Sequence, residues 1–286
     1  MSAIIEARGL AKRYGSGKQA VAGVDFKVGA GRIVGLIGRN GAGKTTVIKS
    51  ILGLTPYQGS LTVLGRNPAS ERDVLMREVS FIADVAVLPK WLKVKQALDY
   101  VQAVHPAFDR AKAEAFLATT DVKQSHKVRE LSKGMVTQLH LALVLAIRAR
   151  LLVLDEPTLG LDLLVRRRFY DTLLNDYMDE ERTILVTTHQ VEEIEQLLTD
   201  VMFIEQGQIV LDTPVDLIGE RYAQLIVKPD QLAAARAFKP FSERAVLGRN
   251  VLFYENGPRE QLAALGDLGT PTIADLFVAR MQQEAA

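Results

Sequence analysis

Four residues at fixed spacing form the clearest chemical pattern in this chain. Residues 35–46 read GLIGRNGAGKTT, and Gly38, Gly43, Lys44 and Thr45 occupy the fixed positions of the pattern G-x-x-x-x-G-K-[ST]. Glycines in such a loop let backbone N–H groups point at phosphate oxygens, because no Cβ stands in the way. We therefore expect Lys44 to reach the β- and γ-phosphates of a nucleotide and the Thr45 hydroxyl to bind Mg²⁺.

A second group of polar residues follows a continuous apolar run at residues 151–154. Continuous apolarity, as opposed to alternation, predicts a parallel strand that is buried on both faces. Asp155 and Glu156 come at the carboxyl end of this strand, where doubly wound sheets place their ligands. The pattern predicts that Asp155 holds Mg²⁺ through water and that Glu156 is the adjacent base or water-orienting group.

His189 is the third chemical candidate. It ends a run of β-branched residues at 183–188, which predicts another strand, and a histidine at this edge of a sheet can donate to a γ-phosphate. His105, His126 and His140 have no such context, and we interpret them as structural residues.

The elements on either side of the glycine loop are those that the loop needs. The apolar run at residues 33–37 predicts a buried strand, and residues 45–52 predict a helix that Gly53 is well placed to end. The N-terminus of that helix adds partial positive charge beside the loop.

Of three further residues, Tyr14 and Trp91 have two interpretations each and Ser132 has one. Tyr14 lies in a polar loop predicted at residues 12–17, where the ring either stacks on a purine or packs on the sheet, and spacing does not decide between them. Ser132 is a plausible N-cap of a long apolar helix predicted at 136–149. For Trp91 we favour packing in a core over contact with a partner.

Composition narrows the class of protein. The chain has 286 residues, 48% hydrophobic and 24% charged, which is typical of a soluble globular protein with an ample core. A net charge of +1 gives no overall attraction to nucleic acid, and the absence of cysteine excludes disulfides and thiolate metal sites. The N-terminus lacks the features of a signal peptide, and the longest nearly uncharged apolar stretch, 139–147, is far below the ~20 residues that span a bilayer. Any membrane role is therefore expected to come through a partner.

Periodicity predicts the remaining elements. The further strands are expected at residues 4–7, 21–28, 60–64 and 78–83, with a hairpin of 201–204 and 208–211. The further helices are expected at residues 94–104, 110–119 and 191–198, and a mainly helical insertion begins near Asp84. Beyond residue 221 a small α+β appendage is expected, with strands at 222–227 and 245–254 and helices near 231–237 and 272–281.

Taken together, the motifs resemble those of the ATP-binding subunits of ABC transporters, over roughly residues 3–220. In chain order they are the glycine loop, the LSKGM stretch at 131–135, the strand end at 151–156, the residues 160–162 and His189. LSKGM is similar to the family's LSGGQ signature, with Ser132 and Gly134 kept and Lys133 and Met135 substituted. This form is similar to that of export-type and drug-resistance-type subunits, whose membrane domains are separate chains.

The resemblance implies an α/β fold with a P-loop NTPase core. That core has a mostly parallel sheet, an antiparallel β-subdomain and a helical subdomain at about residues 84–135. The ATP-binding domain is then expected to span residues 1–220, and the α+β appendage residues 221–286.

The resemblance also implies ATP and Mg²⁺ as ligands. Glu156 takes the role of the catalytic base, His189 senses the γ-phosphate, and Lys44 completes the catalytic set. Thr45 and Asp155 hold Mg²⁺.

Further implied roles concern the adenine ring and a second protomer. Tyr14 stacks on adenine, whereas Ser132, Gly134 and Asp162 act on or beside the nucleotide of the opposite protomer, which makes the working unit a head-to-tail dimer. The residues expected to bind ATP are Tyr14, Gly38, Asn40, Gly41, Ala42, Gly43, Lys44, Thr45, Thr46, Ser132, Gly134 and Asp162.

Two positions depart from the family's pattern. Asp84 stands where the family usually has a glutamine that contacts Mg²⁺ and the attacking water, and aspartate is shorter and charged, so it is expected to bind metal more strongly but to reach less far. Leu163 replaces the usual proline after Asp162.

The function expected from the resemblance is Mg-dependent ATP hydrolysis that powers a transporter, with a lean to export. The subunit would pair with a second copy or a paralogue and dock on integral membrane subunits, as a cytoplasmic protein on the inner face of the cell membrane. The alternatives are a soluble ABC-type ATPase acting on nucleic acid or the ribosome and a non-hydrolysing regulatory subunit. No basic tail or second domain supports the first, and Glu156 and His189 argue against the second.

Overall fold

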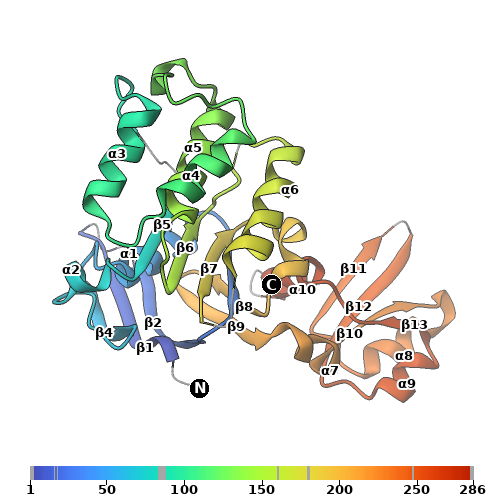
Figure 1. Cartoon of the computed structure of the whole chain (residues 1–286). Helices are drawn as coiled ribbons and strands as arrows, with labels where there is room; N and C mark the ends of the chain where they lie inside the picture. The colour runs from blue at the N-terminus through green and yellow to red at the C-terminus, as the bar shows by residue number, and fades with distance from the viewer. Residues whose placement is uncertain are drawn as a thin grey trace.

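The computed structural model is built around a six-stranded sheet (Figure 1). In spatial order its strands are β5 (Val79–Ile82), β6 (Leu151–Asp155), β7 (Thr183–Thr188), β3 (Ile33–Ile37), β8 (Asp200–Glu205) and β9 (Gln208–Pro214). The first five are parallel, and β9 returns antiparallel to β8. Every residue of β3, β6 and β7 is buried, as the continuous apolar runs predict.

The structure describes most of the chain. The described residues are 3–15, 17, 19–82, 88–159, 161–178, 181–246 and 248–283. Within these ranges no helix is long and apolar enough to cross a membrane.

The strand order places the chemical candidates at one edge. Strand β7 lies between β6 and β3, with Thr187 paired to Asp155 on one side and Thr188 paired to Ile37 on the other. Because parallel strands share a carboxyl edge, the glycine loop, Asp155 and His189 all emerge there.

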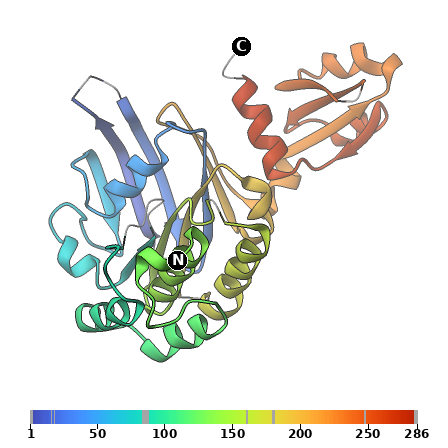
Figure 2. The same cartoon turned by 90° about the horizontal axis from the view of Figure 1, so that it is seen from above.

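A three-stranded antiparallel sheet packs against one face of the central sheet (Figure 2). Its spatial order is β2 (Gln19–Gly29), β1 (Ala3–Arg13) and β4 (Gln58–Val63). The prediction for β1 was too short, since Lys12 and Arg13 were assigned to a loop. Both are in the strand, because their backbones pair with Val21 and Gln19 of β2.

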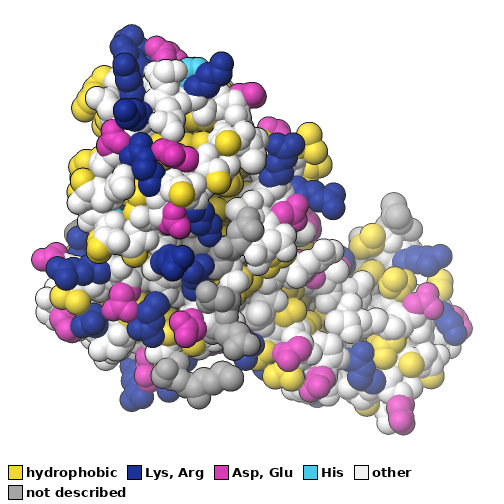
Figure 3. Space-filling model, viewed as in Figure 1, with side chains coloured by type: hydrophobic (Ala, Val, Ile, Leu, Met, Phe, Trp, Pro, Cys, Tyr) yellow, Lys and Arg dark blue, Asp and Glu magenta, His cyan; other side chains and the backbone are white. Residues whose placement is uncertain are grey.

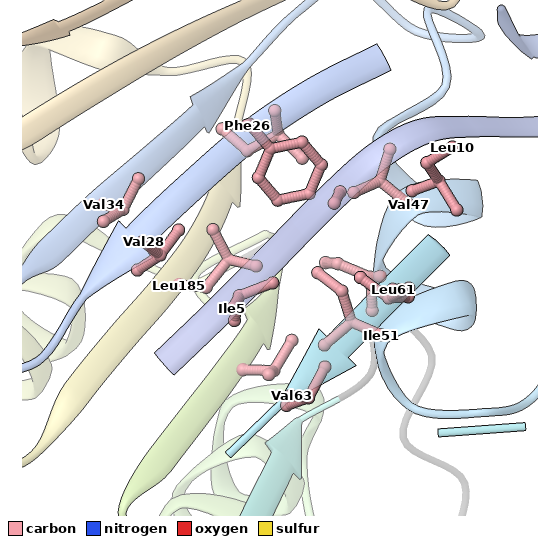
Figure 4. Packing of buried hydrophobic residues seen from close by; sticks show 14 of the residues in the cluster. Ile5, Leu10, Phe26, Val28, Val34, Val47, Ile51, Leu61, Val63 and Leu185 are labelled. Carbon is pink, nitrogen blue, oxygen red and sulfur yellow. The ribbon is translucent and has the colours of Figure 1, made fainter. Parts of the chain in front are cut away.

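The helix α1 (Lys44–Ile51) fills the space between these two sheets. Figure 4 shows Val47 and Ile51 of this helix in the same packed cluster as Phe26 from β2 and Leu185 from β7. The helix was predicted to within one residue at each end, and it terminates before Gly53, whose φ of 63° lies in the left-handed region. The glycine loop is therefore held in position by the helix that follows it, because the apolar side of that helix is buried between the two sheets.

A helical part reaches the opposite face of the central sheet through its last helix, whose Leu141 and Leu145 lie in the buried cluster on that face (Figure 1). It consists of α3 (Val94–Val104), α4 (Arg110–Ala118), η1 (Val128–Glu130) and α5 (Lys133–Leu145), with the short α2 (Arg72–Leu75) before it. The helix predicted at 136–149 begins three residues earlier and ends at Leu145, because Ser132 caps it: its Oγ accepts from Met135 N at 3.2 Å. The prediction of a core position for Trp91 was wrong, since 68% of this residue is exposed.

The segment after the central acids also differs in detail from the prediction. It contains α6 (Leu163–Thr172), the π-helical turn η2 (Leu173–Tyr177) and, after β7, the 3₁₀ turns η3 (Val191–Glu193) and η4 (Glu195–Leu197). The single helix predicted at 191–198 is wrong. A 3₁₀ turn brings residues three apart onto one side, and this buries both Val191 and Ile194.

The C-terminal region is α+β, as predicted, and it forms a separate four-stranded antiparallel sheet with short helices (Figure 2). Its elements are η5 (Val215–Leu217), α7 (Ile218–Arg221), β10 (Tyr222–Val227), η6 (Pro229–Gln231), α8 (Leu232–Ala237), β11 (Ser242–Val246), β12 (Arg249–Glu255), α9 (Arg259–Ala263), β13 (Gly266–Gly269) and α10 (Ile273–Gln283). The single strand predicted at 245–254 is instead the end of β11, a turn with Gly248 at φ 77°, and most of β12.

The last helix joins this region to the central sheet. Ile273 and Leu276 of α10 belong to the same buried cluster as Phe203 of β8, and the rings of Phe203 and Phe277 lie 5.2 Å apart. At the start of the helix, Ile273 N donates to the Glu195 carboxylate at 2.8 Å. The C-terminal region is therefore anchored through α10 to the turns that follow β7.

Candidate active site

The glycine loop passes close to two other strands. A Cβ at Gly38 would lie 2.4 Å from the carbonyl oxygen of Ile204, and one at Gly43 would lie 2.4 Å from that of Ala20. Gly43 also has φ 119°, which side chains other than glycine rarely adopt. The two fixed glycines are thus required by close backbone approach, and the loop is held where its N–H groups can line a cavity.

Lys44 folds back across this loop. Its ammonium donates to the Gly38 carbonyl at 2.7 Å and lies 3.4 Å from Glu156 Oε1, and the residue is buried. The loop borders a cavity of about 260 Å³, and the residues lining it are Tyr14, Ala20, Arg39, Asn40, Gly41, Gly43, Lys44, Thr45, Thr46 and Glu156. Seven residues predicted to bind ATP therefore lie around one cavity, and they come from the loop and from the β1–β2 turn. Ala20 and Arg39 also line it, although their spacing in the sequence gave no reason to single them out.

Glu156 connects the glycine loop to His189, which follows the end of β7. Its Oε1 faces Lys44, and its Oε2 lies 2.9 Å from His189 Nδ1. The three residues predicted to be catalytic are thus in direct contact, although Lys44 and His189 are far apart in the sequence. Glu156 has a left-handed φ of 49°, an uncommon conformation for a side chain of this size and one that is concentrated at functional sites.

Thr187 holds both acids and was missed by the sequence analysis. Its Oγ1 donates to Asp155 Oδ1 at 2.7 Å and lies 3.2 Å from Glu156 N, which donates to it. Thr187 is completely buried in β7, so it fixes the carboxylate of Asp155 and the backbone of Glu156 together. The only sequence signal is a hydroxyl in an apolar strand, which is weak because threonine is common in strands.

Tyr14 lies at the open side of the cavity. It is 40% exposed, and the Lys12 ammonium lies 5.0 Å from its ring centroid, within cation–π range. The ring therefore borders the phosphate loop and is not packed in the sheet core. Of the two open interpretations, this position is compatible with stacking on a base.

Five residues predicted to bind ATP do not line this cavity. Gly38 and Ala42 belong to the glycine loop itself, and the other three lie elsewhere in the chain. Ser132 and Asp162 are N-caps, of α5 and α6, and Asp162 Oδ1 accepts from Leu164 N and Val165 N at 3.0 Å each. Gly134 lies in the first turn of α5. Both cap residues are exposed, and neither they nor Gly134 line the nucleotide cavity of their own chain. Asp84 lies outside the described residues.

The oxygen atoms near the loop suit magnesium. Among the described residues no group of three His, Cys, Asp or Glu side chains could hold a metal ion on its own. Mg²⁺ is usually bound by one or two carboxylates together with substrate phosphates, and Asp155 and the Thr45 hydroxyl are hard oxygen donors of that kind. Asp155 is buried with one oxygen fixed by Thr187, so its carboxylate is pre-oriented.

The parallel sheet, the glycine loop at its edge and the acid–histidine contact define a P-loop ATPase. The protein family described as "ABC transporter" matches residues 21–159. ABC transporter ATP-binding protein YtrB of Bacillus subtilis is 30% identical, over 78% of this chain and 76% of its own length. Nod factor export ATP-binding protein I of Cupriavidus pinatubonensis is 33% identical, over 93% of this chain and 84% of its own length. A solved structure of an ATP binding subunit of an ABC transporter superposes with a TM-score of 0.68 at 26% identity, over 75% of this chain and 91% of that one.

The chain belongs to the family of ABC transporter ATP-binding proteins. Its fold is the ABC ATPase fold, and its activity is ATP hydrolysis coupled to transport. These relatives confirm the resemblance seen in the motifs.

Proposed function

We propose that the protein binds Mg·ATP in the 260 Å³ cavity and hydrolyses it as one half of a head-to-tail dimer that drives an exporter. The observation that carries this proposal is the contact chain from Lys44 through Glu156 to His189 at the carboxyl edge of the sheet. The name of the Nod factor export relatives supports the direction of transport.

Each side chain has a defined task in this proposal. The loop N–H groups and Lys44 hold the phosphates, Glu156 accepts a proton from the attacking water, and His189 donates to the γ-phosphate. Tyr14 stacks on adenine. Thr45 and Asp155 would hold magnesium, with Asp84 as a third candidate ligand, and the bound ion would neutralise phosphate charge.

Glu156 is well placed for its role because two side chains orient its carboxylate and a third holds its backbone. Lys44 and His189 each face one oxygen, and the peptide nitrogen is tied to Thr187. A base held in this way needs little reorganisation when water attacks, and positioning of this kind is a main source of rate in phosphoryl transfer.

A dimer is supported by the exposure of the residues that do not reach the cavity. Ser132, Gly134 and Asp162 lie on or beside the N-termini of α5 and α6. Helix N-termini bind anions well, so they suit the phosphates of a nucleotide carried by a second protomer. Leu163 and Leu164, at the start of α6, are 75% and 72% exposed and supply apolar surface for such a contact.

Docking on membrane-spanning subunits is supported by the surface of the helical part. Trp91, Tyr100 and Val104 are at least 58% exposed on α3 and the segment before it. Figure 3 shows hydrophobic side chains at the surface along α3. Exposed aromatic and aliphatic residues of this size favour a protein contact, and we place the subunit on the inner face of the cell membrane.

The test of the proposal is Glu156→Gln. The variant is expected to bind ATP with unchanged affinity, because the loop and the magnesium ligands are intact, and to lose turnover while collecting as an ATP-bound dimer. ATP binding, phosphate release and molecular mass in solution are the measurements. Glu260→Gln, at an exposed acid of α9, is the matched control. Wild-type turnover by Glu156→Gln would remove Glu156 from the role of base.

A further inference from the structure

Arg166 of α6 contacts two loops at once. Its Nε donates to the Leu161 carbonyl oxygen at 2.8 Å, and its Nη1 donates to Gln190 Oε1 at 3.0 Å. The same Nη1 forms an ion pair with Glu193. The side chain of Arg166 is only 19% exposed, so these contacts are largely shielded from water.

The first loop is the one that ends in Asp162. Leu161 is buried, its N–H donates to the Thr158 carbonyl at 3.1 Å, and its carbonyl receives the Arg166 bond. The Asp162 side chain is occupied with capping α6, so Arg166 and the cap together fix this loop.

The second loop is the one that begins at His189. Gln190 follows the histidine directly, with its N–H donating to Thr188 Oγ1 at 2.9 Å and its side-chain oxygen accepting from Arg166. Glu193 ends η3, the turn that continues this loop. The loop is therefore held by β7 on one side and by Arg166 on the other.

One planar guanidinium is suited to this double contact. Its N–H groups point in fixed directions within a plane, so it can serve the Leu161 carbonyl through Nε and the acceptors at Gln190 and Glu193 through Nη1. A lysine ammonium is a compact charge without this fork. A displacement of one loop is thus transmitted to the other through a single rigid group.

We infer that Arg166 is a positioning residue that couples the position of the Asp162 loop to the position of the His189 side chain. A second protomer that contacts the Asp162 loop then sets the place of His189 beside Glu156, so that hydrolysis responds to dimer contact. The inference rests on the proposed roles of Asp162 at the dimer surface and His189 at the γ-phosphate. Arg166 itself does not line the nucleotide cavity.

The first measurement compares two arginines. Arg166→Ala is expected to lower kcat on the order of ten-fold or more, because small misplacements of catalytic groups cost rate steeply, and to leave the ATP dissociation constant unchanged. Arg166→Lys keeps the charge without the fork and is expected to recover only part of the loss. Arg249→Ala, at an exposed arginine of β12 in the C-terminal sheet, is the control and is expected to match wild type.

The second measurement separates positioning from general structural damage. In a His189→Ala background, Arg166→Ala is expected to cost little further activity, because the group that it positions is gone; independent damage would multiply with the His189 effect. If Arg166→Ala does not fold, Gln190→Ala removes one acceptor and takes its place in the same cycle.

Multiplicative effects in this cycle, or equal kcat for Arg166→Ala and Arg249→Ala, would overturn the inference. Failure of the proposed function is seen separately, as wild-type turnover by His189→Ala or Glu156→Gln, whatever the Arg166 variants do.

Discussion

The two oxygens of the Glu156 carboxylate have different neighbours. Oε1 lies 3.4 Å from the Lys44 ammonium, whereas Oε2 lies 2.9 Å from the imidazole of His189. Thr187 ties the backbone of Glu156 to the carboxylate of Asp155, so the proposed base and the proposed magnesium ligand share one support. At the scale of single residues, the site is a connected set and not a collection of independent groups.

Thr187 gives the prediction that belongs to this scale. Thr187→Val keeps the shape and removes the hydroxyl, which leaves Asp155 Oδ1 without its 2.7 Å donor. Losing a group that orients a metal ligand typically costs about ten-fold or more in metal affinity or activity, so we expect a higher Mg²⁺ requirement in ATPase assays. Magnesium titrations at fixed ATP measure it, with Thr187→Ser as the control. Identical titrations for the valine and serine variants would contradict the role of the hydroxyl.

At the scale of elements, α5 connects the helical part to the central sheet and carries an unusual residue in its interior. His140 is buried, as are its neighbours Leu139 and Leu141, and within the described part of the chain its Nε2 has no hydrogen-bond partner. Burial lowers the pKa of His140, because the charged imidazolium loses its water. The histidine is thus held neutral inside the fold.

This burial predicts a pH dependence of stability. The folded pKa lies below the unfolded value of about 6.5, so the unfolded chain binds a proton first, and stability is complete above that value and decreases as the pH falls through it. His105 has a pKa shifted in the same direction, chiefly by burial, and adds to the effect.

The measurement is the melting temperature as a function of pH. His140→Leu is expected to flatten the decrease below neutral pH, with His126→Gln, in a loop of the same helical part, as the control. For a chain of this size, about 1 kcal/mol corresponds to roughly 2–4 °C in Tm, which is readily resolved. An equally steep decrease in His140→Leu would assign the pH dependence to other groups.

At the scale of the whole molecule, one nucleotide site is spread over surfaces that do not meet in one chain. The phosphate loop, Glu156 and His189 surround or adjoin one cavity, whereas Ser132 and Asp162 cap helices elsewhere. The C-terminal sheet is held to the central sheet by α10, and Figure 2 shows it well away from the helical part. It therefore leaves the surfaces of α5 and α6 open to a second protomer.

The prediction at this scale is complementation between two inactive variants. Lys44→Ala and Ser132→Arg are each expected to be inactive as pure homodimers. A mixed dimer has one site with both lesions and one site with intact Lys44 from one chain and intact Ser132 from the other. Random pairing makes about half of the dimers mixed, so recovery of up to roughly a quarter of wild-type activity is expected.

ATPase activity across a range of mixing ratios is the measurement, with subunit exchange confirmed by mass. Strict alternation between the two sites would lower the recovery, so the claim concerns its presence and not its size. No recovery at any ratio, with exchange confirmed, would count against the head-to-tail arrangement.

The sequence by itself determined the parts of this protein that depend on local constraints. Gly38 and Gly43 tolerate no side chain, since a Cβ at either would lie 2.4 Å from a carbonyl oxygen, and the apolar run before Asp155 forms a buried strand. The pattern of residues therefore placed the loop, the acids and His189 at strand ends without coordinates. The parallel order of the strands then brings them to one edge, and the family resemblance, now confirmed, gave the same architecture.

Only the tertiary structure decided the contacts between residues distant in sequence. The bond from Thr187 to Asp155, the span of Arg166 from Leu161 to Gln190 and the packing of α10 on β8 each join separate elements. Tertiary structure also decided the two features that the sequence predicted wrongly: Trp91 is exposed, and residues 191–197 form two 3₁₀ turns. An apolar residue type indicates a preference for burial, and helical spacing indicates a helical backbone. Tertiary packing decides whether the residue is in fact buried and whether the backbone forms an α-helix or the tighter 3₁₀ turn.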